Sequence, residues 1–137
     1  MKLVLGRNFS REFDVIEQIT IMNQIESNLN NYFLNRHYGD RINQIYIGII
    51  CVSKGFDPFF PLSDKIKLNR NPPEIEYGVK LDFDIYRNLP KEQKIIYTYS
   101  EILKRSVNML SKKTINDFDK DSFIKDLEEF VSKNTNN

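Results

Sequence analysis

Four carboxylates alternate with apolar residues in the segment that ends at Tyr86. Glu74, Glu76, Asp82 and Asp84 all fall on one side of this alternation, and alternate residues of a β-strand lie about 6.5–7 Å apart. Two carboxylates at this separation could act as the acid and base of an inverting glycosidase. A solvated strand face is the commoner reason for such a pattern, and the chain has no tryptophan to line a sugar cleft. A small hydrolase that uses this row is therefore the alternative, and a non-catalytic role is the main expectation.

The single cysteine and the single histidine both have ordinary explanations. Cys51 lies in the apolar run 45–52, where burial would raise its pKa and hide the thiol. His37 follows a predicted helix, and a cation is favourable at a helix C-terminus. Two such ligands are too few for a zinc site, and no glycine pattern typical of a phosphate loop is present. We expect no catalytic residue, no metal site and no cofactor.

Three phenylalanines, Phe56, Phe59 and Phe60, stand close together in a segment that Pro58 and Pro61 would stiffen. If these rings are exposed, they are anchors for a protein partner, because they lose little conformational entropy on binding. If they fold inward, they are a lid on the core. The sequence leaves both alternatives open. If the rings are exposed, the three phenylalanines are predicted partner-binding residues.

The acidic strand face is the second predicted partner-binding feature. Its members, Glu74, Glu76, Asp82 and Asp84, could steer a basic protein toward the chain, for example a nuclease whose active site attracts phosphates. The chain as a whole has a formal net charge of +1, so it has no global field to hold nucleic acid. We therefore expect a protein partner rather than nucleic acid.

The elements that must position these residues follow from hydrophobic spacing. A long helix is expected from Ser10 to Arg36, with Val15, Ile16 and Ile19 at the start of its apolar stripe. Lys2 to Leu5 is expected to form a short strand before it. An apolar strand over 42–53, a short strand over 65–69 and a two-sided strand over 74–86 should follow.

Two amphipathic helices are expected to close the chain. One has Asn88 or Leu89 near its cap and Pro90 in its first turn and reaches about residue 110, and the other runs from Lys120 to Lys133, before a polar tail at 132–137 that frays. A strand with one polar face suits an antiparallel sheet. The predicted fold is therefore α+β, an antiparallel sheet with a long N-terminal helix and two C-terminal helices packed against it. At 137 residues without a linker, the chain is expected to be a single domain, 1–137.

Composition indicates a globular protein of the cytoplasm. Hydrophobic residues make up 40% and charged residues 28% of the chain, and no apolar stretch approaches the roughly 20 residues needed to cross a membrane. The N-terminus is too soon interrupted to be a secretory signal, and one cysteine cannot form an internal disulfide. The absence of alanine beside abundant Ile, Asn and Lys suggests an AT-rich bacterial genome.

The C-terminal half of the chain resembles small bacterial immunity proteins of polymorphic toxin systems, the contact-dependent inhibition type. The residues that carry the resemblance are 71–77, 80–84, 117–119, Phe123 and 126–127. The resemblance implies a single-domain cytoplasmic protein that binds and blocks a cognate toxin, often a nuclease, with no turnover and no cofactor. An inhibitor that occludes a toxin's active site is therefore our main hypothesis. The rivals are the small hydrolase and an adaptor domain that assembles with copies of itself through the long strand or the first helix.

Overall fold

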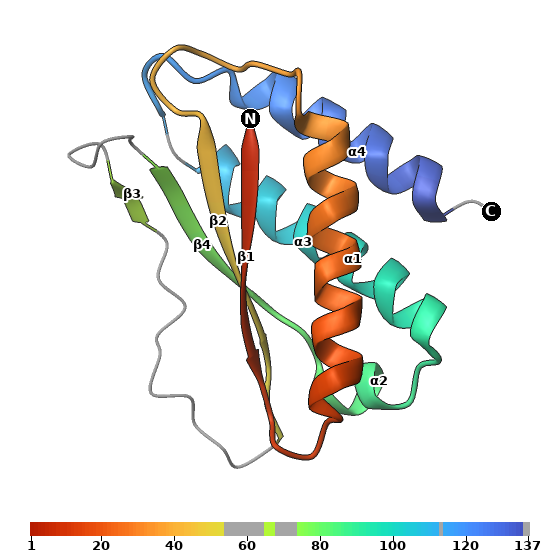
Figure 1. Cartoon of the computed structure of the whole chain (residues 1–137). Helices are drawn as coiled ribbons and strands as arrows, with labels where there is room; N and C mark the ends of the chain where they lie inside the picture. Colours follow the sequence, from red (N-terminus) through yellow and green to blue (C-terminus); the bar gives the residue numbers. More distant parts are fainter. Residues whose placement is uncertain (54–64, 68–73, 113, 136–137) are drawn as a thin grey trace.

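The computed structural model describes residues 1–53, 65–67, 74–112 and 114–135 (Figure 1). Strands and helices alternate at the start of the chain, and helices follow one another at its end. In chain order the elements are β1 (Lys2–Phe9), α1 (Val15–Phe33), β2 (Gln44–Cys51), β3 (Lys65–Lys67), β4 (Glu74–Lys80), α2 (Phe83–Arg87), α3 (Lys91–Ser111) and α4 (Lys120–Thr135).

The sheet is mainly parallel. Its strand order is β1-β2-β4-β3. The strands β1, β2 and β4 run in the same direction, with Lys2 opposite Gln44 and Gln44 opposite Glu74, and only β3 runs against β4. The expected antiparallel sheet is therefore wrong for the three long strands. The reason is that α1 carries the chain back along the sheet between β1 and β2, so that β2 enters beside β1 in the same direction.

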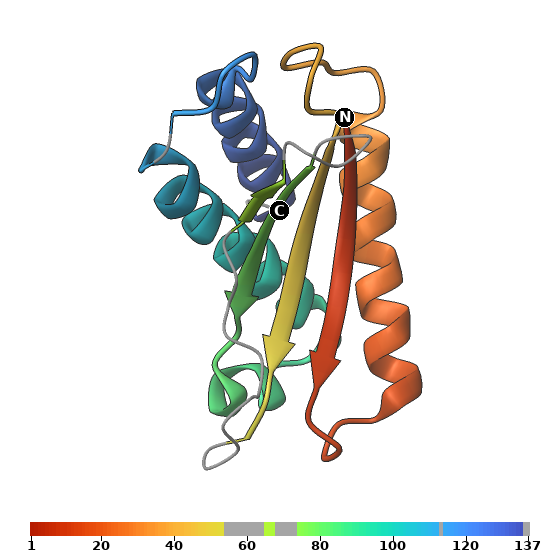
Figure 2. The ribbon, with the colours of Figure 1, turned by 90° about the vertical axis from the view of Figure 1, so that its left-hand side faces the viewer.

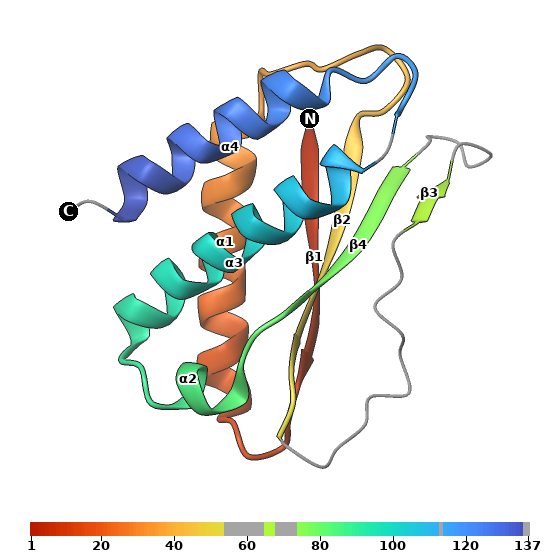
Figure 3. The ribbon, with the colours of Figure 1, turned by 180° about the vertical axis from the view of Figure 1, so that it is seen from behind.

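All the helices lie on one side of the sheet, as Figures 1 and 3 show from opposite directions. In Figure 2 the strands lie in front of α3 and α4. This arrangement explains why β4 has two unlike faces although its long neighbour is parallel, since only one face of the sheet receives helices. The inward side chains of the sheet are buried against the helices: Leu3, Leu5, Ile45, Ile47, Ile49, Ile75, Tyr77 and Val79.

The three long helices are confirmed, with shifted bounds: α1 ends at Phe33 and not at Arg36, and α4 continues to Thr135, so the prediction of a frayed tail from residue 132 is wrong for residues 132–135. The helix α1 begins after Asp14, whose carboxylate accepts a hydrogen bond from the backbone N–H of Glu17 at 3.0 Å. Ser10, where the helix was expected to begin, instead donates its backbone N–H to the carbonyl of Cys51 at 2.9 Å and so continues the pairing of β1 with β2. Asp119 caps α4, because its carboxylate accepts from the backbone N–H of Ser122 at 3.1 Å.

The strand predicted over 74–86 ends early. The strand β4 stops at Lys80, and Asp82 caps the short helix α2 by accepting from the backbone N–H of Ile85 at 3.0 Å. An aspartate followed by a free N–H three residues later is a favourable helix start. This local bond competes with continued strand pairing, which ends where Leu81 donates its N–H to the carbonyl of Ile50 at 2.8 Å.

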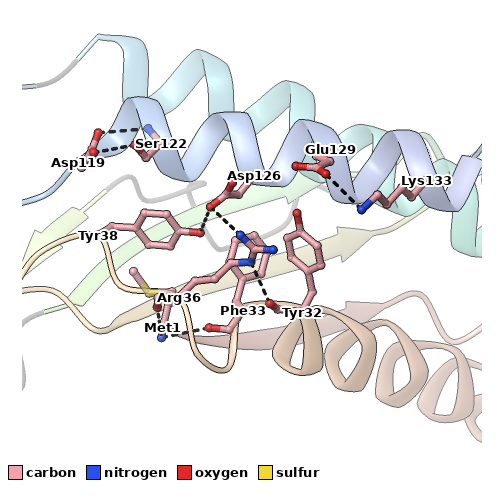
Figure 4. Close-up of polar contacts among 10 residues, drawn as sticks. All are labelled: Met1, Tyr32, Phe33, Arg36, Tyr38, Asp119, Ser122, Asp126, Glu129 and Lys133. Carbon is pink, nitrogen blue, oxygen red and sulfur yellow. Dashed lines mark hydrogen bonds and ion pairs between the residues drawn. The ribbon is translucent and has the colours of Figure 1, made fainter.

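The end of α1 is joined to α4 by polar contacts (Figure 4). The Tyr38 hydroxyl donates to the Asp126 carboxylate at 2.6 Å, and the Arg36 guanidinium lies 3.4 Å from the same oxygen. The amino group of Met1 donates to the carbonyls of Phe33 and Arg36, at 3.3 and 2.9 Å. The contacts of Asp126 hold α4 over the C-terminal end of α1, and those of Met1 hold the start of β1 there. Within the described ranges, no helix combines the length and the apolar character needed to cross a membrane.

Candidate partner-binding surface

The four predicted carboxylates do not form one row. Glu74 and Glu76 lie at the start of β4, on the sheet face that points away from the helices, and Glu74 accepts a hydrogen bond from the Gln44 amide at 3.2 Å. Asp82 and Asp84 lie beyond the other end of β4, at the start of α2. The prediction of a four-carboxylate strand face is therefore wrong, because the strand ends between the two pairs.

The sheet face that carries Glu74 and Glu76 is crossed by a row of small residues. Gly6, Gly48 and Gly78 are opposite one another in the parallel register. A side chain at Gly6 would overlap the hydroxyl of Tyr46, so the glycines make room for this ring to lie against the strands. The face thus combines a packed tyrosine with two half-buried glutamates.

Asp82 and Asp84 belong to a different part of the molecule. They lie at the end of the sheet where β1 and β2 finish and α1 begins (Figures 1 and 3). An aromatic cluster forms its base. The rings of Phe9 and Phe13 lie 5.7 Å apart, Phe13 lies 5.2 Å from Phe83, and Phe13 lies 5.5 Å from Tyr86. Ring pairs at these distances attract one another beyond simple burial. The cluster therefore ties β1, the loop before α1, and α2 together.

Buried polar contacts strengthen the same region. The Tyr86 hydroxyl donates to the side-chain carbonyl of Gln18, which joins α2 to α1. The Lys94 ammonium of α3 lies 3.4 Å from the Glu17 carboxylate and over the ring of Tyr86, 5.4 Å from its centre. Lys94 is buried, and burying an ammonium costs free energy unless it has such partners. The starts of α1, α2 and α3 are thus fixed relative to one another.

Apolar side chains are exposed above this base. Among the described residues, the large apolar side chains with high exposure are Val15, Ile16, Ile19 and Ile85 at this end, with exposed fractions of 68%, 78%, 46% and 51%, and Leu34 at the far end of α1. The expectation that Val15, Ile16 and Ile19 begin a buried stripe is wrong. Helical spacing could not show this, because these residues lie three and four positions apart and lead to the buried Met22.

The exposed apolar residues are accompanied by acids. Segments 11–19 and 81–87 together carry five carboxylates and two arginines, although the chain as a whole is near neutral. Asp14, Asp82 and Asp84 are exposed among them. We call this region the α1–α2 surface, which is made of Asp14, Val15, Ile16, Ile19, Asp82, Asp84 and Ile85. Sequence reasoning found two of its acids and missed its apolar members.

The other predicted partner-binding residues, Phe56, Phe59 and Phe60, lie outside the residues that the structure describes. Over the part of the chain that is described, no group of three or more His, Cys, Asp or Glu side chains is placed to hold a metal ion. What the site region offers is therefore a surface of apolar and acidic side chains on a rigid base.

A model of the family described as Immunity protein 44 matches residues 1–133. The chain belongs to the Immunity protein 44 family. The match runs from β1 into the last turns of α4, so it also includes the N-terminal half, which the resemblance from sequence did not reach. The predicted resemblance to immunity proteins is confirmed. The search of curated proteins and the search of solved structures gave no significant match.

Membership of Immunity protein 44 indicates a general role in toxin neutralisation and implies a toxin protein as partner. The α1–α2 surface of this family member fits contact with a protein, since exposed apolar patches with a polar rim are typical of interaction sites.

Proposed function

We propose that this protein neutralises one cognate toxin domain in the bacterial cytoplasm by binding it with one-to-one stoichiometry and covering its active site. The observation that carries the proposal is the family match over residues 1–133. Inhibition by occlusion needs a stable complementary surface and no catalytic group. The α1–α2 surface and its rigid aromatic base support such a mechanism.

We further propose that the toxin domain is basic at the surface that is covered, as a nuclease active site is. Asp82 and Asp84 are exposed beside apolar side chains, and carboxylates in this position would steer a cationic partner and occupy the place of substrate phosphates. Glu74 and Glu76 lie at the other end of β4 and would contact the partner only if the interface extended along the sheet.

The rival functions have less support from the geometry. The hydrolase hypothesis used two carboxylates of the row, and only Glu74 and Glu76 still share a strand face. The adaptor hypothesis used the long strand or the first helix, and of these β4 pairs with β2 along one side and, over Glu74–Glu76, with β3 on the other. This pairing leaves less of the backbone edge of β4 for a second copy, while the first helix stays available for contact with one. A role for Phe56, Phe59 and Phe60 stays a prediction.

The test begins with the tagged protein as bait in its own cells and mass spectrometry of what co-purifies. The recovered partner domain is then expressed in a bacterial host with and without this protein. We expect growth arrest by the partner domain alone and growth when both are present. With purified components, toxin activity should fall to zero near one equivalent of this protein. Persistent toxicity would contradict the proposal, and inactivation far below one equivalent would indicate catalysis instead of occlusion.

A further inference from the structure

We infer that the α1–α2 surface is the docking site for the toxin domain, and that the toxin meets it with an apolar patch bordered by lysine and arginine side chains. The inference rests on the proposed function and adds to it the face that binds and the chemistry of the partner's surface.

Clustering of exposed apolar side chains is the first argument. Single exposed apolar residues are normal on any protein surface. Here Val15 and Ile16 occupy the first turn of α1, and Ile19 follows one turn later. Ile85 lies on α2, whose Phe83 and Tyr86 pack on Phe13 in the loop before α1 and whose Tyr86 hydroxyl bonds Gln18 of α1. An apolar group of this kind gains most from a partner that removes it from water.

Rigidity of the base is the second argument. The rings beneath the surface pack on one another, and the bonds from Tyr86 to Gln18 and from Lys94 to Glu17 join three helices. Side chains carried by a fixed base lose little freedom when a partner docks. The apolar residues are therefore presented in the arrangement that a binding surface requires.

Charge is the third argument, and it selects the kind of partner. Apart from Glu17, which pairs with the buried Lys94, the carboxylates of segments 11–19 and 81–87 outnumber the arginines by four to two. Asp14 and Asp82 are held in place by accepting the N–H groups of Glu17 and Ile85, each at 3.0 Å. An acidic border around apolar anchors favours a partner whose border is basic.

The sheet edge beside α1 is a poorer alternative for docking. The outer strand β1 could in principle accept an added strand from a partner. However, the Asn30 amide bonds both the N–H and the carbonyl of Leu3, at 2.9 and 2.7 Å, and the Glu26 carboxylate accepts the N–H of Leu5 at 2.8 Å. Helix α1 therefore occupies backbone groups that a partner strand would need.

The apolar part is tested with Ile16→Lys and its matched control Leu34→Lys. Both side chains are exposed residues of the same helix region, 78% and 67% respectively, at opposite ends of α1, and both changes add one positive charge. The probe is the purified toxin domain that passes the growth test. We expect Ile16→Lys to raise the dissociation constant by at least about tenfold, mainly through faster dissociation, and Leu34→Lys to leave it within about twofold. Urea unfolding shows that both variants are folded.

The charged part is tested with Asp14→Asn combined with Asp82→Asn. Asparagine keeps an oxygen that can cap each helix and removes only the charge. We expect the association rate with the same toxin domain to fall by about threefold or more and to become less sensitive to salt. Asp40→Asn combined with Asp121→Asn removes two exposed carboxylates from the loop before β2 and the first turn of α4, and it should leave both quantities unchanged.

The outcomes separate this inference from the function on which it rests. If the wild-type protein binds the toxin domain and neither Ile16→Lys nor the paired asparagine variant changes the kinetics, the α1–α2 surface is not the docking site and the proposed function stands. If the wild-type protein binds no toxin domain, both fail. If the protein alone is a dimer that Ile16→Lys converts to a monomer without loss of toxin affinity, the surface serves a second copy of this chain and the inference is overturned.

Discussion

The Cys51 thiol illustrates how position decides the chemistry of one residue. It is fully buried at the end of β2. Burial raises its pKa to about 12, the negative charge of Asp82 adds to the rise, and the positive charge of Lys94 opposes it. Since the thiolate is the reactive form, the expectation from sequence of a hidden, inert cysteine agrees with the structure.

We therefore predict that Cys51 in the folded protein reacts with iodoacetamide at pH 8 at least about a hundredfold more slowly than in the unfolded chain. Mass spectrometry of samples quenched over time measures both rates, with the urea-unfolded protein as control. Comparable rates in the two states would contradict the buried position of the thiol.

Tyr38 is a residue whose hydroxyl joins two distant parts of the chain. It is buried, and burial and then its hydrogen bond to Asp126 raise the pKa of the phenol. We predict that Tyr38→Phe lowers the free energy of unfolding at pH 7 by about 1–2 kcal/mol, because the phenol–carboxylate bond is lost while Asp126 keeps its contact with Arg36. Urea unfolding followed by circular dichroism gives this difference. An unchanged free energy of unfolding would mean that the hydrogen bond makes no net contribution to stability.

At the scale of elements, the contact between α1 and the edge strand β1 replaces the sheet neighbour that β1 lacks on its outer side. The amide of Asn30 bonds both backbone groups of Leu3, which is buried. Glu26 accepts the N–H of Leu5 and lies 3.6 Å from the Arg7 guanidinium. A helix thus protects the sheet from pairing with other chains.

We predict that Asn30→Leu lowers the free energy of unfolding by about 2 kcal/mol, because two backbone groups of β1 lose their partner, and that the variant self-associates more readily through the uncovered edge. Urea unfolding and sedimentation measure the two effects. Asn31→Leu is the matched control, since Asn31 is the exposed neighbour on the same helix. If the two variants have the same free energy of unfolding and the same tendency to self-associate, the amide of Asn30 does not protect the edge of β1.

At the scale of the whole molecule, one apolar core joins the elements. The buried cluster includes side chains from β1, β2 and β4 and from every described helix. The aromatic pairs Tyr32–Phe130, Phe33–Phe123 and Tyr99–Phe130 connect α4 to α1 and α3 at 5.0–5.4 Å between ring centres.

We predict that the chain unfolds as a single cooperative unit, as expected for one domain. Far-UV circular dichroism and tyrosine fluorescence should give the same midpoint and the same slope with urea. The chain has seven tyrosines and no tryptophan, so the fluorescence reports the aromatic core directly. Separate midpoints would show that part of the molecule unfolds independently.

The sequence by itself determined the elements whose signals are local. Helical spacing located α1, α3 and α4, although the start of α1 was placed too early, and the alternation over Ile75, Tyr77 and Val79 located β4. These signals are reliable because each arises within a few residues, from a hydrogen bond three positions away or from side chains on the same face. The immunity family also followed from such patterns, and the family match confirmed it.

Only the tertiary structure decided the strand directions and the site. A single polar face on a strand suits an antiparallel sheet or a parallel sheet covered on one side, and the path of α1 selected the second. The same packing divided the carboxylates of Glu74 and Glu76 from those of Asp82 and Asp84, and it left Val15 and Ile16 exposed. Spacing along a helix shows which residues share a face, but exposure depends on which distant elements cover that face, and this is settled only when the chain folds.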